Sequence, residues 1–140
     1  MLFKRYHIYP MHTGLKTHTR RLWKKPHCKI GGTYDITHRM YYTPEDVVGQ
    51  IYVTSMYRQP LGMMTGLDAI EEGGYDLTTY RMVLDEISKE VVPNTTVLWV
   101  IKFRFILSDI IDGNGGTNDI DAYRDEYVAH MKRCGIEARV

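Results

Sequence analysis

The chain has 140 residues, of which 44% are hydrophobic and 25% charged, and its formal net charge is +1. This composition is typical of one globular domain and excludes a wholly disordered chain. No apolar run approaches the roughly 18–20 residues that a membrane span needs, and the N-terminus lacks the apolar core of a secretory signal. We therefore expect neither a membrane span nor secretion by a signal peptide.

The two halves of the charge distribution differ in sign. Residues 1–40 hold nine of the 18 Lys and Arg residues, five of the six histidines and a single acid, so their net charge is near +8. Residues 41–140 hold nine bases and sixteen acids, for a net charge near −7. We therefore interpret residues 1–40 as a basic, His-rich N-terminal arm and residues 41–140 as an acidic body.

The basic region is predicted to contain two strand segments separated by an extended arm. Residues 2–9 alternate roughly and predict a strand that stops at Pro10. Residues 11–29 show no period and are predicted to be extended. Residues 29–42 predict a second strand region, which a pair of glycines interrupts with a turn or bulge.

The acidic body is predicted to begin with a short helix. A Thr-Pro-Glu-Asp motif at residues 43–46 is typical of a helix start, and the alternation that follows Gly49 predicts a strand. Residues 60–75 lack a period and predict a long loop with Met63 and Met64 at its centre. Because loops of this length are usually functional or bound to a partner, we expect these methionines in an interaction loop.

The rest of the body predicts two main helices around a central strand. Asp76 caps a helix that runs to about Val92, and residues 95–107 show the clearest strand alternation. After a Gly/Asn/Asp loop at residues 112–118, a last helix is followed by a short strand at residues 136–140. The predicted fold is α+β: a mostly antiparallel sheet with two main helices packed on one face, preceded by an extended basic N-terminal arm.

Motifs for metal binding or catalysis do not occur in the sequence. The arm histidines and Cys28 do not have the spacing of a zinc motif, and Asp112-Gly113-Asn114-Gly115 fits no EF-hand register. We therefore expect no metal and no cofactor. Nucleophile elbows, Walker loops and dinucleotide fingerprints do not occur either. If the chain is an enzyme, the candidates for acid–base catalysis and charge stabilisation are His12, His38 and Arg39.

A cluster of cations around Trp23 is the strongest binding signal. Phosphate contacts by such cations give affinity without sequence choice, and an indole can stack on a base. The predicted contact residues for a partner or nucleic acid are Lys16, Arg20, Arg21, Trp23, Lys24, Lys25 and Lys29.

These features favour a non-enzymatic structural subunit of a larger assembly, similar in design to virion connector or capsid-associated proteins. The basic arm would dock on acidic neighbouring subunits of a homo- or hetero-oligomer, or on nucleic acid. The alternative is a small nucleic-acid-binding enzyme or regulator that acts on phosphodiesters with His and Arg of the arm. Two cysteines are too few for a disulfide scaffold and indicate an intracellular reducing compartment or a virion, although a single Cys28–Cys134 bridge is an alternative.

Overall fold

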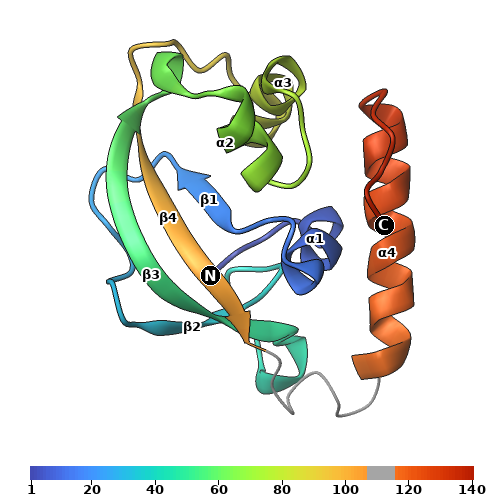
Figure 1. Cartoon of the computed structure of the whole chain (residues 1–140). Coiled ribbons are helices and arrows are strands. Elements are labelled where there is room, and N and C mark those ends of the chain that lie inside the picture. Colours follow the sequence, from blue (N-terminus) through green and yellow to red (C-terminus); the bar gives the residue numbers. More distant parts are fainter. Residues whose placement is uncertain (107–115) are drawn as a thin grey trace.

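A curled antiparallel sheet organises the computed structural model, which describes residues 1–106 and 116–140, with side chains of the last helix described from residue 120 (Figure 1). The strand order is β1-β4-β3-β2, and every pairing between neighbours is antiparallel. The strands are β1 (His18–Arg21), β2 (Thr33–Ile36), β3 (Gly49–Pro60) and β4 (Val97–Ile106). The predicted α+β class is confirmed, and β4 is an interior strand of the sheet, as its alternation predicted.

The curl of the sheet arises in its longest pair of strands. β3 pairs with β4 along its length, with a register shift between Val53 and Ser55. Such a bulge bends a strand and increases its twist. The apolar residues of one face therefore turn inward, where Val53 packs with Ile101 and Phe103.

The helices lie along one side of the sheet (Figure 1). α2 and α3 lie beside β1, while α4 packs against η1 and α1 on the outside of the molecule. The helical elements are η1 (Arg5–His7), α1 (Ile8–Thr13), η2 (Pro44–Asp46), η3 (Leu61–Met63), α2 (Gly66–Glu71), α3 (Leu77–Ser88) and α4 (Gly116–Arg133). A short helix at η2 followed by a strand confirms the prediction for residues 43–60.

Residues 1–40 are not an extended arm, which corrects the sequence interpretation. They supply η1, α1 and both edge strands of the sheet, β1 and β2. The predicted strand at residues 2–9 is wrong because Pro10 is the third residue of α1. In the first turn of a helix the missing amide hydrogen of proline is not needed, so Pro10 does not mark an end.

Two further segments differ from the sequence predictions. Residues 60–75 contain η3 and α2, and α2 begins with a capping box in which Thr65 Oγ1 accepts from the Asp68 amide. The predicted strand at residues 136–140 does not form; instead Ile136 packs against the core. The Gly/Asn/Asp loop, including the rejected calcium motif Asp112-Gly113-Asn114-Gly115, lies for the most part outside the described residues.

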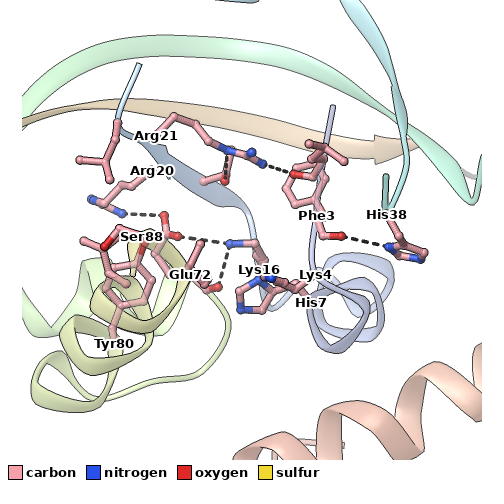
Figure 2. A pocket seen from close by; sticks show the side chains of 15 residues that line it. Phe3, Lys4, His7, Lys16, Arg20, Arg21, His38, Glu72, Tyr80 and Ser88 are labelled. Carbon is pink, nitrogen blue, oxygen red and sulfur yellow. Dashed lines mark hydrogen bonds and ion pairs between the residues drawn. The ribbon is translucent and has the colours of Figure 1, made fainter. Parts of the chain in front are cut away.

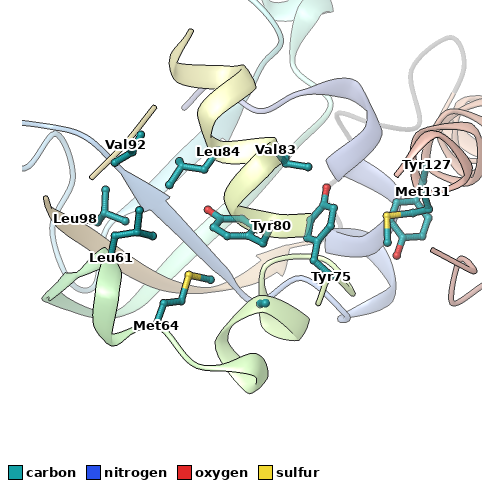
Figure 3. Close-up of a cluster of buried hydrophobic side chains, with 11 residues drawn as sticks. Leu61, Met64, Tyr75, Tyr80, Val83, Leu84, Val92, Leu98, Tyr127 and Met131 are labelled. Carbon is teal, nitrogen blue, oxygen red and sulfur yellow. The ribbon is translucent and has the colours of Figure 1, made fainter. Parts of the chain in front are cut away.

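Among the described residues, the buried apolar side chains form two clusters that meet at the N-terminal helical segment. One lies under α2, α3 and α4 and is shown in Figure 3; the other fills the curled sheet. Tyr9 packs against both. Burying one large aliphatic side chain contributes about 1.5–3 kcal/mol, and Ile8 and Met11 of the N-terminal segment are fully buried in the second cluster.

Candidate functional site

A cavity of about 420 Å³ lies where the N-terminal segment, β1 and α3 meet (Figure 2). One part of its wall is apolar and aromatic, and another carries charged groups. The lining residues are Leu2, Phe3, Lys4, His7, Lys16, Thr19, Arg20, Arg21, Leu22, His38, Glu72, Tyr80, Leu84, Ile87 and Ser88.

The charged part of the wall centres on Lys16 and Glu72, which are 2% and 1% exposed. Lys16 Nζ donates to Glu72 Oε1 at 3.2 Å and to the backbone carbonyls of Glu72 at 2.9 Å and His18 at 2.8 Å. These acceptors account for the three ammonium hydrogens. Burial lowers the pKa of Lys16, and Glu72 partly offsets that effect. Burial that lowers the pKa of a lysine makes its neutral, basic form more accessible than in an exposed lysine.

A second cation completes this cluster from the same strand. Arg20 Nη1 donates to Glu72 Oε2 at 2.8 Å, so each oxygen of that carboxylate has its own cation. Arg20 also contacts Asp68 at 3.4 Å and donates from Nη2 to Gln59 Oε1 at 3.0 Å. A buried carboxylate is tolerated only when paired in this manner, so removing either cation or anion leaves an uncompensated charge.

Thr19 and Arg21 of β1 add a hydroxyl and a guanidinium to the cavity wall. Thr19 Oγ1 accepts from Arg21 Nε at 3.0 Å, while Arg21 Nη2 donates to the Leu2 carbonyl at 2.7 Å. The Arg21 guanidinium also lies over the Phe3 ring, 4.7 Å from its centroid. Arg21 is therefore fixed from two sides, and its positive charge faces the oxygen of Thr19.

Two histidines line the cavity opposite β1. His38 Nδ1 bonds to the Phe3 carbonyl at 2.9 Å and must therefore be protonated, so Nε2 accepts from the Tyr123 hydroxyl at 3.0 Å. Burial lowers the pKa of His38 and lowers that of His7 further, where the charge of Lys16 adds to the effect. Both rings are therefore neutral near pH 7.

The residues proposed for a phosphodiester enzyme lie in different settings. His38 lines the cavity, but His12 packs edge-on against Phe105, 5.6 Å between ring centroids. Arg39 is exposed and pairs with Asp46 at 2.7 Å. Of these three residues, His38 lines the cavity, whereas His12 and Arg39 are not among its lining residues.

The predicted contact residues for a partner divide into two groups. Lys16 and Arg20 are buried in the cluster around Glu72, and Arg21 is half-buried. Trp23 is also half-buried and lies 4.8 Å from His27 between ring centroids. The exposed cations of the set are Lys24, Lys25 and Lys29.

The predicted interaction loop is divided in the same way. Met63 is 68% exposed, but Met64 is 5% exposed and belongs to the core cluster under α3. Met64 is therefore a core residue, and its assignment to a contact loop is corrected.

Sequence reasoning missed Thr19, Glu72 and Tyr80. The alternation of Lys16, His18 and Arg20 with threonines was a signal for a strand at the end of the arm. Nothing local marks Glu72, which follows α2 and meets β1 only in the folded chain.

Within the described ranges, no group of three or more His, Cys, Asp and Glu side chains is placed to hold a metal ion. Nor does any helix in this part of the chain have the length and apolar character needed to cross a membrane.

Comparison with known proteins identifies the fold. No protein-family model and no curated protein matches the chain. Among solved structures it is similar to an ASCH domain from Lactobacillus crispatus JV V101, with a TM-score of 0.59 and 12% identity over 75% of this chain and 76% of that one. It is also similar to protein EF3133 (DUF984) from Enterococcus faecalis V583, with a TM-score of 0.51 and 15% identity over 75% and 77% of the two chains. These similarities support an α+β fold like that of the ASCH domain, and they concern the fold alone.

Proposed function

We propose that the chain is a small hydrolase that removes an acyl group from a compact, planar substrate bound in the cavity. The observation that carries this proposal is the buried Lys16, held by Glu72 in the wall of a cavity that also presents the Thr19 hydroxyl. A hydroxyl with a lysine base is one of the recurring ways to activate a nucleophile.

The cavity favours a particular kind of substrate. Its volume of about 420 Å³ is in the range of small-molecule sites. Phe3 and Tyr80 offer aromatic surface for a flat ring, while Arg21 offers a cation for a carbonyl or anionic group. An amide or ester of a heteroaromatic amine or alcohol meets these requirements.

The proposed reaction has two half-reactions with a common base. Lys16 Nζ acts after it has given one proton to solvent, the form that its burial favours. Thr19 Oγ1 then attacks the substrate carbonyl carbon and gives its proton to Lys16 Nζ, which passes it to the departing nitrogen or oxygen. Water then attacks the Thr19 ester and gives one proton to Lys16 Nζ, which passes it to the departing Thr19 Oγ1. The other proton of the water leaves with the released acid. The threonine is regenerated, and one water is consumed for each bond cleaved.

Two neighbours support these roles electrostatically. Arg21 donates to Thr19 Oγ1 and stabilises negative charge that develops there during release of the proton. Glu72 orients Lys16 through Oε1 while Arg20 balances its second oxygen. Glu72 is thus a positioning residue for the base.

The test is a hydrolysis assay on a panel of acetyl and larger acyl amides and esters with heteroaromatic leaving groups. Thr19→Val keeps the shape of the side chain but removes the nucleophile, so at least a 10²-fold loss of kcat/KM is expected. Thr17→Val is the matched control: Thr17 is two residues away and bonds to His18 instead of lining the cavity. Equal activity of the two variants, or a fully inactive wild-type protein across the panel, contradicts the proposal.

The assembly role expected from the sequence is a second candidate on narrower grounds. Lys24, Lys25 and Lys29 are exposed on the segment between β1 and β2, beside the Trp23–His27 ring pair. This surface supports docking on nucleic acid or on an acidic protein. Its test is charge reversal at the three lysines, which should weaken binding and flatten the salt dependence. Unchanged binding after reversal removes this candidate.

A further inference from the structure

A continuous chain of hydrogen bonds leads from the cavity to helix α4. His7, which lines the cavity, bonds through Nε2 to the Tyr75 hydroxyl at 2.7 Å. The same hydroxyl bonds to His130 Nε2 at 2.8 Å. Tyr75 lies between α2 and α3, so three distant segments of the sequence meet in two hydrogen bonds.

These three hydrogen-bonded residues are buried, and His7 also lines the cavity. His7, Tyr75 and His130 are 6%, 1% and 5% exposed. The Tyr6 ring stacks on His130 with 3.6 Å between centroids and an angle of 11° between planes. Figure 3 shows Tyr75 between Tyr80 and the α4 residues of the same core cluster. Beside its hydrogen bond to Tyr75, His130 Nε2 also lies 3.8 Å from Cys134 Sγ.

His7, Tyr75 and His130 have few protons to share between their two hydrogen bonds. Burial lowers the pKa of His7 well below its usual value and lowers that of His130 to about 4, while it raises the pKa of Tyr75. All three groups are therefore neutral near pH 7. A neutral imidazole has one N–H, and the tyrosine hydroxyl has one proton. Tyr75 must then donate to one histidine and accept from the other, so only one of the two Nε2 atoms carries hydrogen.

We infer that His7, Tyr75 and His130 form a reversible proton shuttle that serves the cavity. In one arrangement His7 Nε2–H donates to Tyr75, which donates to His130. When His7 Nδ1 accepts a proton from the cavity, the Nε2 proton moves to Tyr75 and the Tyr75 proton moves to His130 Nε2. His130 Nδ1 then gives its proton to a solvent water molecule. The reverse transfer returns it, and no bond other than O–H and N–H changes.

The shuttle rests on the proposed function and deepens it. Hydrolysis through an acyl intermediate takes a proton from Thr19 in its first half and from water in its second. His7 is positioned to exchange protons with that chemistry because it lines the same cavity as Lys16. His7, Tyr75 and His130 thereby give the cavity that holds Lys16 a second route for protons. The residues of the shuttle are positioning and transfer groups, not nucleophiles.

The experiment is ¹⁵N NMR of the histidine rings in the full chain at pH 7, without substrate. The shuttle predicts complementary states, with hydrogen on Nε2 of one ring and on Nδ1 of the other. It also predicts that relaxation dispersion gives one exchange rate shared by both rings. Because no substrate is present, the result is independent of the hydrolysis assay, and either proposal can fail alone.

Two variants sharpen this experiment. Tyr75→Phe removes the central hydroxyl, so the shared exchange should be lost. Tyr127→Phe is the matched control, because the Tyr127 hydroxyl is equally buried but donates to the Gly73 carbonyl at 2.8 Å. Shared exchange should survive in that control. Rings in the same Nε2 state, rings that exchange independently, or complementary rings with no exchange in the wild-type protein would each overturn the shuttle.

Discussion

Replacing Glu72 by Gln removes the one charge that two buried cations share. Lys16 and Arg20 lie 3.2 and 2.8 Å from separate oxygens of this carboxylate. A hydrogen bond to a charged group contributes about 1.5–3 kcal/mol, and breaking a buried ion pair from one side typically destabilises a protein by about 3–5 kcal/mol. Lys16 keeps two carbonyl acceptors and Arg20 keeps Gln59, so we expect a loss of about 3–5 kcal/mol in the free energy of unfolding at pH 7.

The same variant should also become more stable with rising pH. Glu72 raises the pKa of Lys16 against the effect of burial, so its loss moves the folded-state pKa further below the unfolded value of 10.5. Between those two values the unfolded chain binds more protons, and the free energy of unfolding therefore increases with pH.

Urea denaturation followed by circular dichroism measures both effects. Glu126→Gln is the matched control, because Glu126 pairs with Arg5 at 2.9 Å but the two side chains are 38% and 54% exposed. Such a surface pair contributes only about 0–1 kcal/mol. If Glu72→Gln loses no more stability than Glu126→Gln, the buried cluster does not have the energetic role argued for it.

Three other perturbations test the fold around the site. Gly74→Ala should lower the free energy of unfolding by about 2–5 kcal/mol, since φ is +89° and a Cβ would lie 2.9 Å from a tyrosine hydroxyl. The control Gly14→Ala, at φ +84° with no atom within 4 Å, should lower it by only about 1–2 kcal/mol in the same urea titration. Asp76→Ala removes the side chain that accepts a hydrogen bond from the amide of residue 79 at the start of α3. It should cost about 1 kcal/mol of stability and so lower the melting temperature. An unchanged melting temperature would contradict a stabilising role for this helix cap. His7 and His130 have lowered pKa values in the folded chain, so stability should fall as pH drops below their unfolded value of 6.5, and a flat urea midpoint between pH 7 and pH 5 would contradict their burial in the neutral form.

Local patterns in the sequence predicted the parts of the fold that depend on local forces. β4 follows from its alternation, and α3 from its cap at Asp76 and its apolar face. The N-terminal forty residues could not be predicted in the same way. Their strands are short, and they join the sheet only by pairing with partners far away, as β1 does with β4.

The charge cluster shows why the site itself escaped prediction. The sequence predicts Lys16 and Arg20 as contacts for a partner or nucleic acid, because they belong to the basic N-terminal region. Their partner Glu72 is more than fifty residues away and reaches them only after α2 packs beside β1. A surplus of charge along the sequence therefore does not show which cations remain exposed; in this chain Lys24, Lys25 and Lys29 do.

The central claim is that the Thr19 hydroxyl carries an acyl group during turnover. Mass spectrometry of the protein quenched during incubation with a slowly hydrolysed aryl ester tests it most directly. The proposal predicts a mass increase equal to the acyl group, located on the peptide that contains Thr19 and lost in Thr19→Val. Hydrolysis that proceeds with the acyl group on another residue, or at an unchanged rate in Thr19→Val, would contradict it.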